Sequence, residues 1–482
     1  MPPSADPSSL PQRVWAALRQ RSATLLRGGR NAANDIAPDF WLNLRNELLT
    51  GRQWLDRAVV LTYAVITGLV VVGFTMLSEL ASEGFAHLRG ISTWGPALTL
   101  LWTPALTVAL LWWTRRFAPA AAGSGIPQVI LALDDDLPKS QRAWLVSLPL
   151  VFHKAGLVIG GQLAGLSIGR EGPTVQMGAG VMDHAKRWLS KHTTIDAHDL
   201  MVAGAAAGIA ATFNTPLGGI IFALEKLSRR RSTSYSALMI SCIVLSGLVA
   251  ISAFGNTTYF GQLSVQSLGR ELLLPGMVVT LVCGLAGGLF ARLIVDSLSA
   301  LPDRFSNWRR SHPYHFGAAC AFAVAVIGVV TGGATAGAGY APTRALLEGH
   351  GELPGVYTLL KFCATWLSTW SGVPGGMFAP SLSIGAGIGH DVALAAGLSR
   401  EAAIPLIALG MVGFLAASTQ APITAFIIVM EMVSGHAMVL SLMACSMIAS
   451  GVGRLVSKPM YTELAARLKL PLAVPEPVQG TR

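Results

Sequence analysis

Charged residues are scarce in this sequence. Only 12% of its 482 residues are Asp, Glu, Lys or Arg, whereas soluble domains carry about a quarter. Paired cysteines are missing as well. The five cysteines stand singly inside apolar stretches, which argues against a zinc site or a disulfide framework (Cys242, Cys283, Cys320, Cys363 and Cys445). The mean hydropathy of +0.54 indicates instead a chain that lies in lipid.

Nine long stretches contain no Asp, Glu, Lys or Arg at all. A helix that spans a bilayer needs about 20 such residues, and a large soluble core would hardly supply nine of these stretches. Because unpaired backbone groups are costly in hydrocarbon, we expect helices there, irregular only where protein or water covers them. The stretches are 58–78, 90–114, 200–224, 233–269, 272–291, 316–343, 362–389, 402–430 and 432–453.

The basic residues collect at the ends of these stretches, which predicts the topology. Residues 1–57 hold eight Lys or Arg side chains and no apolar core, so we expect no cleavable signal there. By the positive-inside rule this tail stays cytoplasmic, and Lys226 with 229–231 marks a second cytoplasmic edge. The formal net charge of +10 therefore reflects topology. Because the basic residues are not interleaved with exposed aromatics, we expect no nucleic-acid partner.

The second half of the sequence repeats the first. Residues 169–180 match 376–387, 207 positions later, in the first glycine, the proline and the closing Gly-Ala-Gly. Asn-Thr-Pro-Leu at 214–217 leads to Glu225, and Gln-Ala-Pro-Ile at 420–423 leads to Glu431, 206 positions later. Duplicated halves predict a transporter whose ion site lies at the repeat interface, between the ends of broken helices.

Glycine and proline interrupt the apolar sequence at three places. Proline is favoured in the first helical turn and glycine permits sharp turns, so each place predicts a helix that starts inside the membrane. The unpaired N–H groups of such helix starts can hold an anion weakly enough to release it. An ordinary helix kink would explain one interruption but not three. The interruptions are Gly123-Ser124-Gly125-Ile126-Pro127, Gly169-Arg170-Glu171-Gly172-Pro173 and Gly375-Gly376-Met377-Phe378-Ala379-Pro380.

These interruptions resemble the signature loops of the CLC family of chloride channels and proton/chloride exchangers, of the bacterial type without CBS domains. The resemblance extends to residues 213–217 (FNTPL) and 458–461 (KPMY), in the family's order. It implies an all-α integral membrane protein with a CLC-type fold of two inverted-topology repeats and many tilted, broken helices. It also implies a homodimer in the lipid bilayer of the cell inner membrane, with both termini cytoplasmic.

The same resemblance predicts the division of the chain. We expect a cytoplasmic N-terminal tail at 1–57 and a CLC transmembrane domain at 58–461, with repeat halves at about 58–231 and 272–461. A short cytoplasmic tail would follow at 462–482. The 21 residues after Tyr461 are too few for the paired CBS domains of longer family members, so we expect no nucleotide regulation through such domains, and no cofactor.

The resemblance also assigns roles to single residues. It implies that chloride is bound by the Ser124 hydroxyl, the Tyr461 phenol and the backbone N–H groups of Met377 and Phe378. It implies that Glu171 is the gating and proton-carrying glutamate, whose carboxylate holds an outer anion position until chloride displaces it or a proton neutralises it. An acid inside a membrane is costly, and a neighbouring anion favours its neutral form, so the physics agrees with this role. No metal site is implied.

Each assignment has a structural alternative. Glu171 could pair with Arg170 or Lys154. Ser124 could merely cap its helix, and Tyr461 could be an aromatic anchor at the membrane surface. Lys154 matches a basic position of the family, where it could raise the potential felt by the anion or form a structural ion pair.

Two residues depart from the family pattern. Many exchangers carry a pair of glutamates after the Asn-x-Pro-Leu motif, of which the second helps to carry protons, whereas this chain has Glu225-Lys226. A lysine with an ordinary proton affinity cannot replace a carboxylate as a relay. Either Glu225 or water then relays protons, or proton coupling is weak. Gln128 replaces a glutamate of many relatives, and we expect it to affect local hydrogen bonds more than selectivity.

Functions of other classes fit the sequence less well. A membrane-embedded enzyme could use the aspartates at 134–136 or His390-Asp391, but no catalytic motif accompanies them. A nucleotide site in the glycine-rich 332–339 would lack a Walker lysine, and a cation transporter would need acidic groups in its broken helices. We therefore expect no enzyme but a proton-coupled chloride exchanger gated by Glu171. The alternative is a passive, voltage-gated chloride channel.

Overall fold

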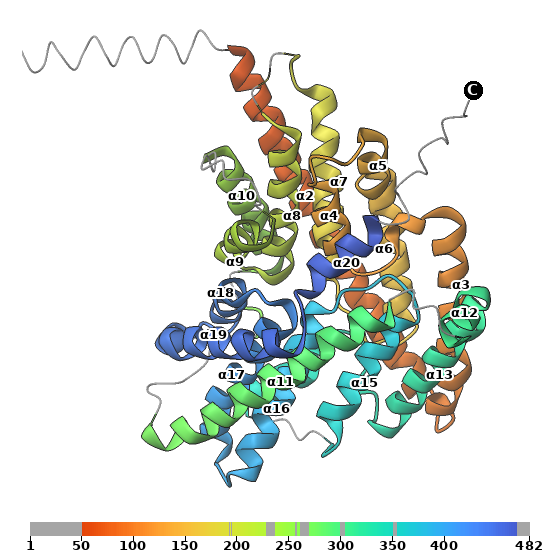
Figure 1. Cartoon of the computed structure of the whole chain (residues 1–482), viewed down its shortest axis with the longest axis vertical. Coiled ribbons are helices and arrows are strands. Elements are labelled where there is room, and N and C mark those ends of the chain that lie inside the picture. The colour runs from red at the N-terminus through yellow and green to blue at the C-terminus, as the bar shows by residue number, and fades with distance from the viewer. Residues whose placement is uncertain are drawn as a thin grey trace, which may run out of the picture. The chain divides into compact units, whose positions relative to one another are not determined.

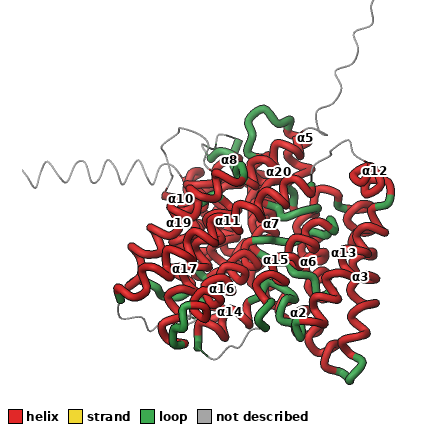
Figure 2. The backbone as a smooth tube through the Cα atoms, turned by 60° about the horizontal axis from the view of Figure 1, so that its bottom comes forward, coloured by secondary structure: helices red, strands yellow, loops and turns green. Residues whose placement is uncertain are grey.

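The computed structural model describes residues 51–191, 193, 195–227, 237–255, 258–260, 269–298, 304–349 and 354–469. These residues form helices and loops, joined by one antiparallel bridge between two glycines (Figure 2). Eight of the described helical segments are long and apolar enough to cross a bilayer. The predicted all-α, multi-span membrane protein is thereby confirmed. The tail residues before 51 and after 469, and the basic residues 229–231, lie outside the described part of the chain.

The first half of the chain holds nine described helices, and the second half holds ten. Those of the first half are α2 (Gly51–Gly90), α3 (Gly95–Phe117), α4 (Ile126–Ala132), α5 (Lys139–Leu145), α6 (Leu148–Leu163), α7 (Glu171–His184), α8 (Ala197–Phe213), α9 (Pro216–Phe222) and α10 (Ala237–Phe254). Those of the second half are α11 (Leu273–Ser297), α12 (Arg304–Ser311), α13 (Pro313–Val330), α14 (Tyr340–Leu347), α15 (Tyr357–Trp370), α16 (Phe378–Ala395), α17 (Arg400–Thr419), α18 (Pro422–Met432), α19 (Val439–Val456) and α20 (Met460–Lys469). Single turns connect some of them, namely η1 (Pro119–Ala121), η2 (Ala185–Trp188), η3 (Ala223–Leu227), η4 (Arg270–Leu272) and η5 (His436–Met438).

The charge-free stretches do not correspond one to one with these helices. Two of the stretches break in the middle, where a left-handed residue ends one helix and a proline starts the next. Asn214 (φ 56°) separates α8 from α9, and Gln420 (φ 53°) separates α17 from α18. Conversely, the candidate span Lys139–Leu163 contains the buried charge of Lys154, so a search for uncharged stretches misses it.

The helices of the two halves follow the same order and pack alike. Helix α7 packs on α8 as α16 packs on α17, and α9 packs on α8 as α18 packs on α17. The two sets meet where α9 contacts α18 (Figure 1). Helix α20 then returns to lie beside α4, a short helix of the first half (Figure 1).

Small residues let the central helices approach closely. A Cβ atom on Gly178 of α7 would collide with the backbone carbonyl of Gly204 of α8, and a Cβ on Gly204 would collide with that of Gly178. The equivalent residues Gly385 of α16 and Gly410 of α17 show the same mutual contact. Such contacts between small residues are typical of packed membrane helices. Helix α7 is buried from Glu171 to Met182 and α16 from Phe378 to Gly389, so the first turns of both helices are buried.

Candidate functional site

Two of the predicted signature loops bind each other directly. The Gly169 N–H donates to the Gly376 carbonyl at 2.7 Å, and the Gly376 N–H donates to the Gly169 carbonyl at 2.8 Å. These glycines hold equivalent positions in the two repeats, so their exchange of bonds marks a local two-fold axis. Helix α7 begins at Glu171 and α16 at Phe378. Two helix N-termini therefore start side by side, one from each repeat.

The third loop joins the same place. The Gly375 N–H donates to the Gly123 carbonyl at 3.4 Å, and α4 begins three residues after Gly123. The residue before α4, Gly125, has a φ of 109°, and a Cβ atom there would lie 2.5 Å from the Gly172 carbonyl oxygen. Only glycine fits such a conformation and such an approach. The three loops thus gather three helix N-termini.

The carboxylate of Glu171 lies at the N-terminus of α16. Its side chain is fully buried, and Oε2 accepts a hydrogen bond from the Ala379 N–H at 3.3 Å. Its other oxygen, Oε1, has no hydrogen-bond partner among the described residues. The first N–H groups of a helix carry partial positive charge and lack partners within the helix. Glu171 therefore occupies an anion position, with one oxygen unsatisfied.

Neither cation considered as a partner for Glu171 pairs with it. Arg170 donates to the Glu79 carboxylate of α2 at 2.9 Å and to the Tyr259 hydroxyl at 3.2 Å. Lys154 donates to two backbone carbonyls. The charge of Arg170 is thus balanced by Glu79, and the structural ion pair considered for Glu171 does not form.

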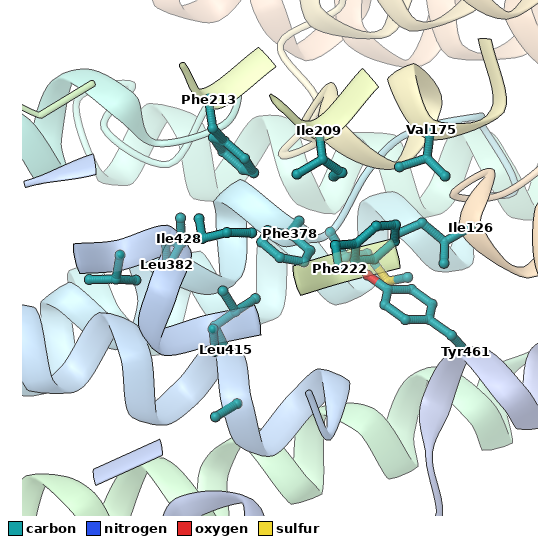
Figure 3. Close-up of a cluster of buried hydrophobic side chains, with 14 of the residues drawn as sticks. Ile126, Val175, Ile209, Phe213, Phe222, Phe378, Leu382, Leu415, Ile428 and Tyr461 are labelled. Carbon is teal, nitrogen blue, oxygen red and sulfur yellow. The ribbon is translucent and has the colours of Figure 1, made fainter. Parts of the chain in front are cut away.

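Ser124 and Tyr461 bring two unsatisfied hydroxyls together. The two hydroxyls lie close enough to pair with each other, and neither buried oxygen meets any other hydrogen-bond partner among the described residues. The phenol oxygen of Tyr461 points into a cluster that contains Ile126, Phe222 and Phe378 (Figure 3). Buried polar groups are nearly always hydrogen-bonded, so two neighbouring exceptions mark a place that suits a ligand.

The alternatives for these two hydroxyls disagree with their surroundings. The cap of α4 is made by Gln128, whose Oε1 accepts from the Gly125 N–H at 3.0 Å and whose amide donates to the Ala122 carbonyl. Ser124 is therefore not the cap. Tyr461 is 3% exposed and belongs to α20, which packs against α4, so it is not an anchor at the membrane surface. Gln128 therefore makes local hydrogen bonds, and its smaller effect on selectivity stays a prediction.

Met377 and Phe378 supply the start of α16. Met377 precedes the first helical residue, Phe378, and the N–H groups of a first turn have no partners within the helix. Both side chains are buried, and the Phe378 ring packs against Phe213 with centroids 5.6 Å apart. The two backbone groups predicted to bind chloride thus lie at the start of α16, next to the carboxylate of Glu171 at Ala379.

An open hollow lies beside the residues just before Tyr461, and two of its five lining residues are basic. The hollow measures about 390 Å³ and is lined by Gln420, Arg454, Ser457, Lys458 and Pro459. Lys226 of η3 donates to the Gln420 carbonyl at 2.8 Å. The departure from the family pattern at Lys226 therefore places a cation next to Gln420, one of the residues that line this hollow, where a glutamate would place a negative charge.

Glu225, which the sequence suggested as a proton relay, makes the contacts of a helix cap. Its two carboxylate oxygens accept from the N–H groups of Ile423 and Thr424 at 3.2 and 2.7 Å, in the first turn of α18. Glu431 does the same for the first turn of α9, with N–H donors at 3.3 and 2.7 Å. Each repeat thus caps a helix of the other, and both oxygens of Glu225 are engaged.

A fourth loop of the same kind was not predicted from the sequence. Residues 337–342 (GAGYAP) precede and enter α14, and the buried Lys361 donates to two carbonyls of this region. Lys361 lies 207 positions after Lys154, which is the spacing of the repeat, and this spacing could have revealed it. The aspartates at 134–136, weighed for an enzyme, lie between α4 and α5, where Lys469 pairs with Asp134.

Comparison with known proteins gives one family. Residues 106–454 match the family described as voltage gated chloride channel. The chain is 30% identical over 433 residues to the H(+)/Cl(-) exchange transporter ClcA of Vibrio cholerae, over 84% of this chain and 88% of that protein. It is 30% identical over 391 residues to the transporter of the same name from Vibrio parahaemolyticus, over 76% of this chain and 80% of that protein.

Solved structures of this family share the fold. A slow cyanobacterial Cl-/H+ antiporter superposes with a TM-score of 0.72 at 24% identity, covering 86% of this chain and 97% of that one. A eukaryotic CLC transporter superposes with a TM-score of 0.67 at 21% identity, covering 85% and 74%. The predicted CLC-type fold of two inverted-topology repeats is thereby confirmed. Because the family match extends over most of the sequence, the chain belongs to the voltage-gated chloride channel family, the CLC family.

Proposed function

We propose that this protein exchanges chloride for protons across the membrane and that Glu171 couples the two ions. The observation that carries the proposal is the position of the Glu171 carboxylate, bound to the N-terminus of α16 beside the Ser124 and Tyr461 hydroxyls. The names of the ClcA relatives, H(+)/Cl(-) exchange transporters, support the same activity.

The Glu171 carboxylate and chloride compete for the N-terminus of α16, and this competition couples the two ions. While Glu171 is ionised, its carboxylate accepts the Ala379 N–H and keeps a chloride ion out of that position. A proton removes the negative charge, weakens this bond and lets chloride take the helix end, because a helix N-terminus favours anions. Chloride that arrives favours the proton in turn, since two neighbouring negative charges repel.

The inner chloride position uses neutral donors. Ser124 and Tyr461 would donate their hydroxyls, and Met377 and Phe378 would donate backbone N–H groups. Dipoles hold a halide more loosely than a lysine or arginine would, which suits an ion that has to leave again. Both hydroxyls are buried and have no partner but each other among the described residues, which leaves them able to accept a ligand.

Reconstitution into liposomes tests the proposal. With an outward chloride gradient and no pH gradient, chloride efflux should draw protons inward, so a chloride electrode and a pH electrode outside should report rising chloride and rising pH together. Glu171→Gln should keep the chloride flux and lose the pH change. Proton movement that survives this substitution would refute the role of Glu171. Chloride flux without any pH change in the unsubstituted protein would refute exchange.

A passive, voltage-gated chloride channel is the second candidate, and Lys226 is the observation that favours it. Protons from the inner side would meet an ammonium group bonded to the Gln420 carbonyl where many exchangers offer a carboxylate. Because both oxygens of Glu225 cap α18, we give Glu225 a structural role. Water would then have to carry protons from the inner side to Glu171.

The proposal includes the assembly and placement of the chain. We propose a homodimer in the cell inner membrane with both termini cytoplasmic, a transmembrane domain at 58–461 and tails at 1–57 and 462–482. The exposed apolar side chains of α9, α18 and α19 support a membrane or subunit contact on that face, for example Leu217, Ile423 and Leu440, which are 42%, 41% and 76% exposed. We further propose transport alone, without an enzymatic activity.

A further inference from the structure

Two lysines lie fully buried in the membrane domain, one in each repeat. Lys154 of α6 and Lys361 of α15 are both 0% exposed. Lys154 donates to two carbonyls at 2.7 Å each, those of Ala121 and Gly123. Lys361 donates to the carbonyls of Thr335 and Gly337 at 2.9 and 2.8 Å. A buried ammonium group is costly unless its donors are satisfied, so these contacts fix the two loops firmly.

The two lysines are equivalent in the repeat. They lie 207 positions apart, and their carbonyl partners lie 214 positions apart in both cases. Each loop leads into a short helix with a proline in its first turn, α4 with Pro127 and α14 with Pro342. Each repeat therefore contains a lysine that binds a glycine-rich loop just before a helix starts.

Each loop is bonded to the other repeat just before a site helix. The Gly123 carbonyl, held by Lys154, also accepts the Gly375 N–H at 3.4 Å, two residues before Met377. The Gly337 N–H, in the loop held by Lys361, donates to the Leu166 carbonyl at 3.0 Å, five residues before Glu171. The connections therefore cross from one half of the chain to the other.

Helix α15 also forms hydrogen bonds with the segment that leads into Glu171. The Ser167 N–H donates to the Ser368 hydroxyl at 3.0 Å, and the Ser167 hydroxyl lies 2.9 Å from that of Thr365. Ser368 and Thr365 belong to the same helix as Lys361. The segment that leads to Glu171 thus rests on α15 and on the loop that Lys361 holds, while Lys154 holds the loop that carries Ser124.

We propose that Lys154 and Lys361 are positioning residues with separate tasks. Lys154 aligns the chloride ligands, namely the Ser124 hydroxyl and the start of α16. Lys361 aligns the segment that carries Glu171 and so sets proton coupling. This inference rests on the proposed function, because it divides between two lysines the chloride and proton halves of that exchange.

Matched methionine substitutions test the division, since methionine keeps much of the aliphatic stem and removes the charge. Lys154→Met should weaken chloride binding by about tenfold or more, as expected when charge-assisted bonds no longer fix the loop. Lys361→Met should not weaken chloride binding, because a misaligned Glu171 competes less with chloride, and it should lose the proton movement that accompanies chloride flux. Affinity is measured by calorimetric titration of the purified protein with chloride, and proton movement by the liposome assay.

A purely structural role would make the two variants alike, and equal losses of affinity and coupling in both would overturn the proposal. Lys361→Arg, which keeps a charged donor, should restore proton movement. If Lys361→Met does not fold, Ser368→Ala takes its place, because it removes only the bond to Ser167. Reduced proton movement at normal chloride affinity is then expected, and normal proton movement in Ser368→Ala would contradict the assignment.

A failure of the lysine proposal can be told apart from a failure of the proposed chloride/proton exchange. If the unsubstituted protein moves chloride without protons, exchange is refuted whatever the lysine variants do. The task of Lys361 is then read from the pH dependence of chloride flux. Lys361→Met should lose this dependence, as Glu171→Gln does, and Lys154→Met should keep it. A Lys361→Met variant with the normal pH dependence would overturn the proposal in that case too.

Discussion

The reciprocal caps formed by Glu225 and Glu431 give a prediction in which each residue serves as the control for the other. Each carboxylate accepts two N–H groups in the first turn of a helix from the other repeat, and each makes one longer and one 2.7 Å bond. Both helices start with a proline, so the second and third residues carry the first free N–H groups. The geometry is the same on both sides, and the energetic effect of removing either carboxylate should be too.

The expected loss of stability follows from the hydrogen bonds that each substitution removes. A hydrogen bond to a charged group contributes about 1.5–3 kcal/mol, and removal of an N-cap costs about 1 kcal/mol. Both glutamates are partly exposed, so we take a value near the lower end for each pair of bonds. Glu225→Ala and Glu431→Ala should each lower the free energy of unfolding by about 2 kcal/mol. Glutamine at either position, which keeps one acceptor oxygen, should cost less.

Thermal unfolding in detergent, followed by the fluorescence of the 12 tryptophans, measures the effect, and the liposome assay shows whether transport survives. The two alanine variants should have similarly lowered Tm values and should both keep the proton-to-chloride ratio of the unsubstituted protein. A Glu225→Ala variant of normal stability would refute the cap. Loss of proton movement in Glu225→Ala but not in Glu431→Ala would reinstate the relay that the sequence suggested for Glu225.

Three other substitutions test the site. Lys226→Glu should raise the number of protons moved per chloride, measured from the reversal potential, because a carboxylate can relay protons from the hollow beside Gln420. An unchanged ratio would show that water already does so. Tyr461→Phe should weaken chloride binding by about tenfold, the value of one hydrogen bond to a charged partner, and calorimetry showing normal affinity would remove the phenol from the site. Gly172→Ala should also weaken chloride binding, because its Cβ would collide with the Ser124 hydroxyl, whereas Gly73→Ala, with open space around it, should bind normally.

The parts of the fold that could be predicted from the sequence are those that depend on a few neighbouring residues. Glycines followed by a proline predict a helix start wherever they occur in apolar sequence, so the starts of α4, α7 and α16 could be located from the sequence alone. The breaks at Asn214 and Gln420 were harder to see. An uncharged stretch continues through both of them, and the left-handed turn leaves the hydropathy unchanged.

The parts that the sequence did not predict depend on contacts between distant segments. The repeat pairs Glu225 with Glu431, but nothing in the sequence shows that each caps a helix of the other repeat, because the two-fold axis appears only in three dimensions. The partner of Arg170 was unpredictable for the same reason, since Glu79 lies 91 residues earlier. The loop before α14 was missed because its proline comes one residue later than in the motif of α4 and an alanine, Ala338, replaces the serine.

The buried cations around the site explain why a halide would be held there by dipoles. Lys154 and Lys361 donate hydrogen bonds to loop carbonyls, and Arg170 forms an ion pair with Glu79. Each full charge is thereby bonded to the protein, where it fixes the geometry of a loop or a helix start and raises the potential nearby. The direct contacts with an anion fall to hydroxyls and N–H groups, whose attraction a moving ion can overcome. A substitution that frees one of these cations to touch the anion should therefore tighten binding and slow transport together.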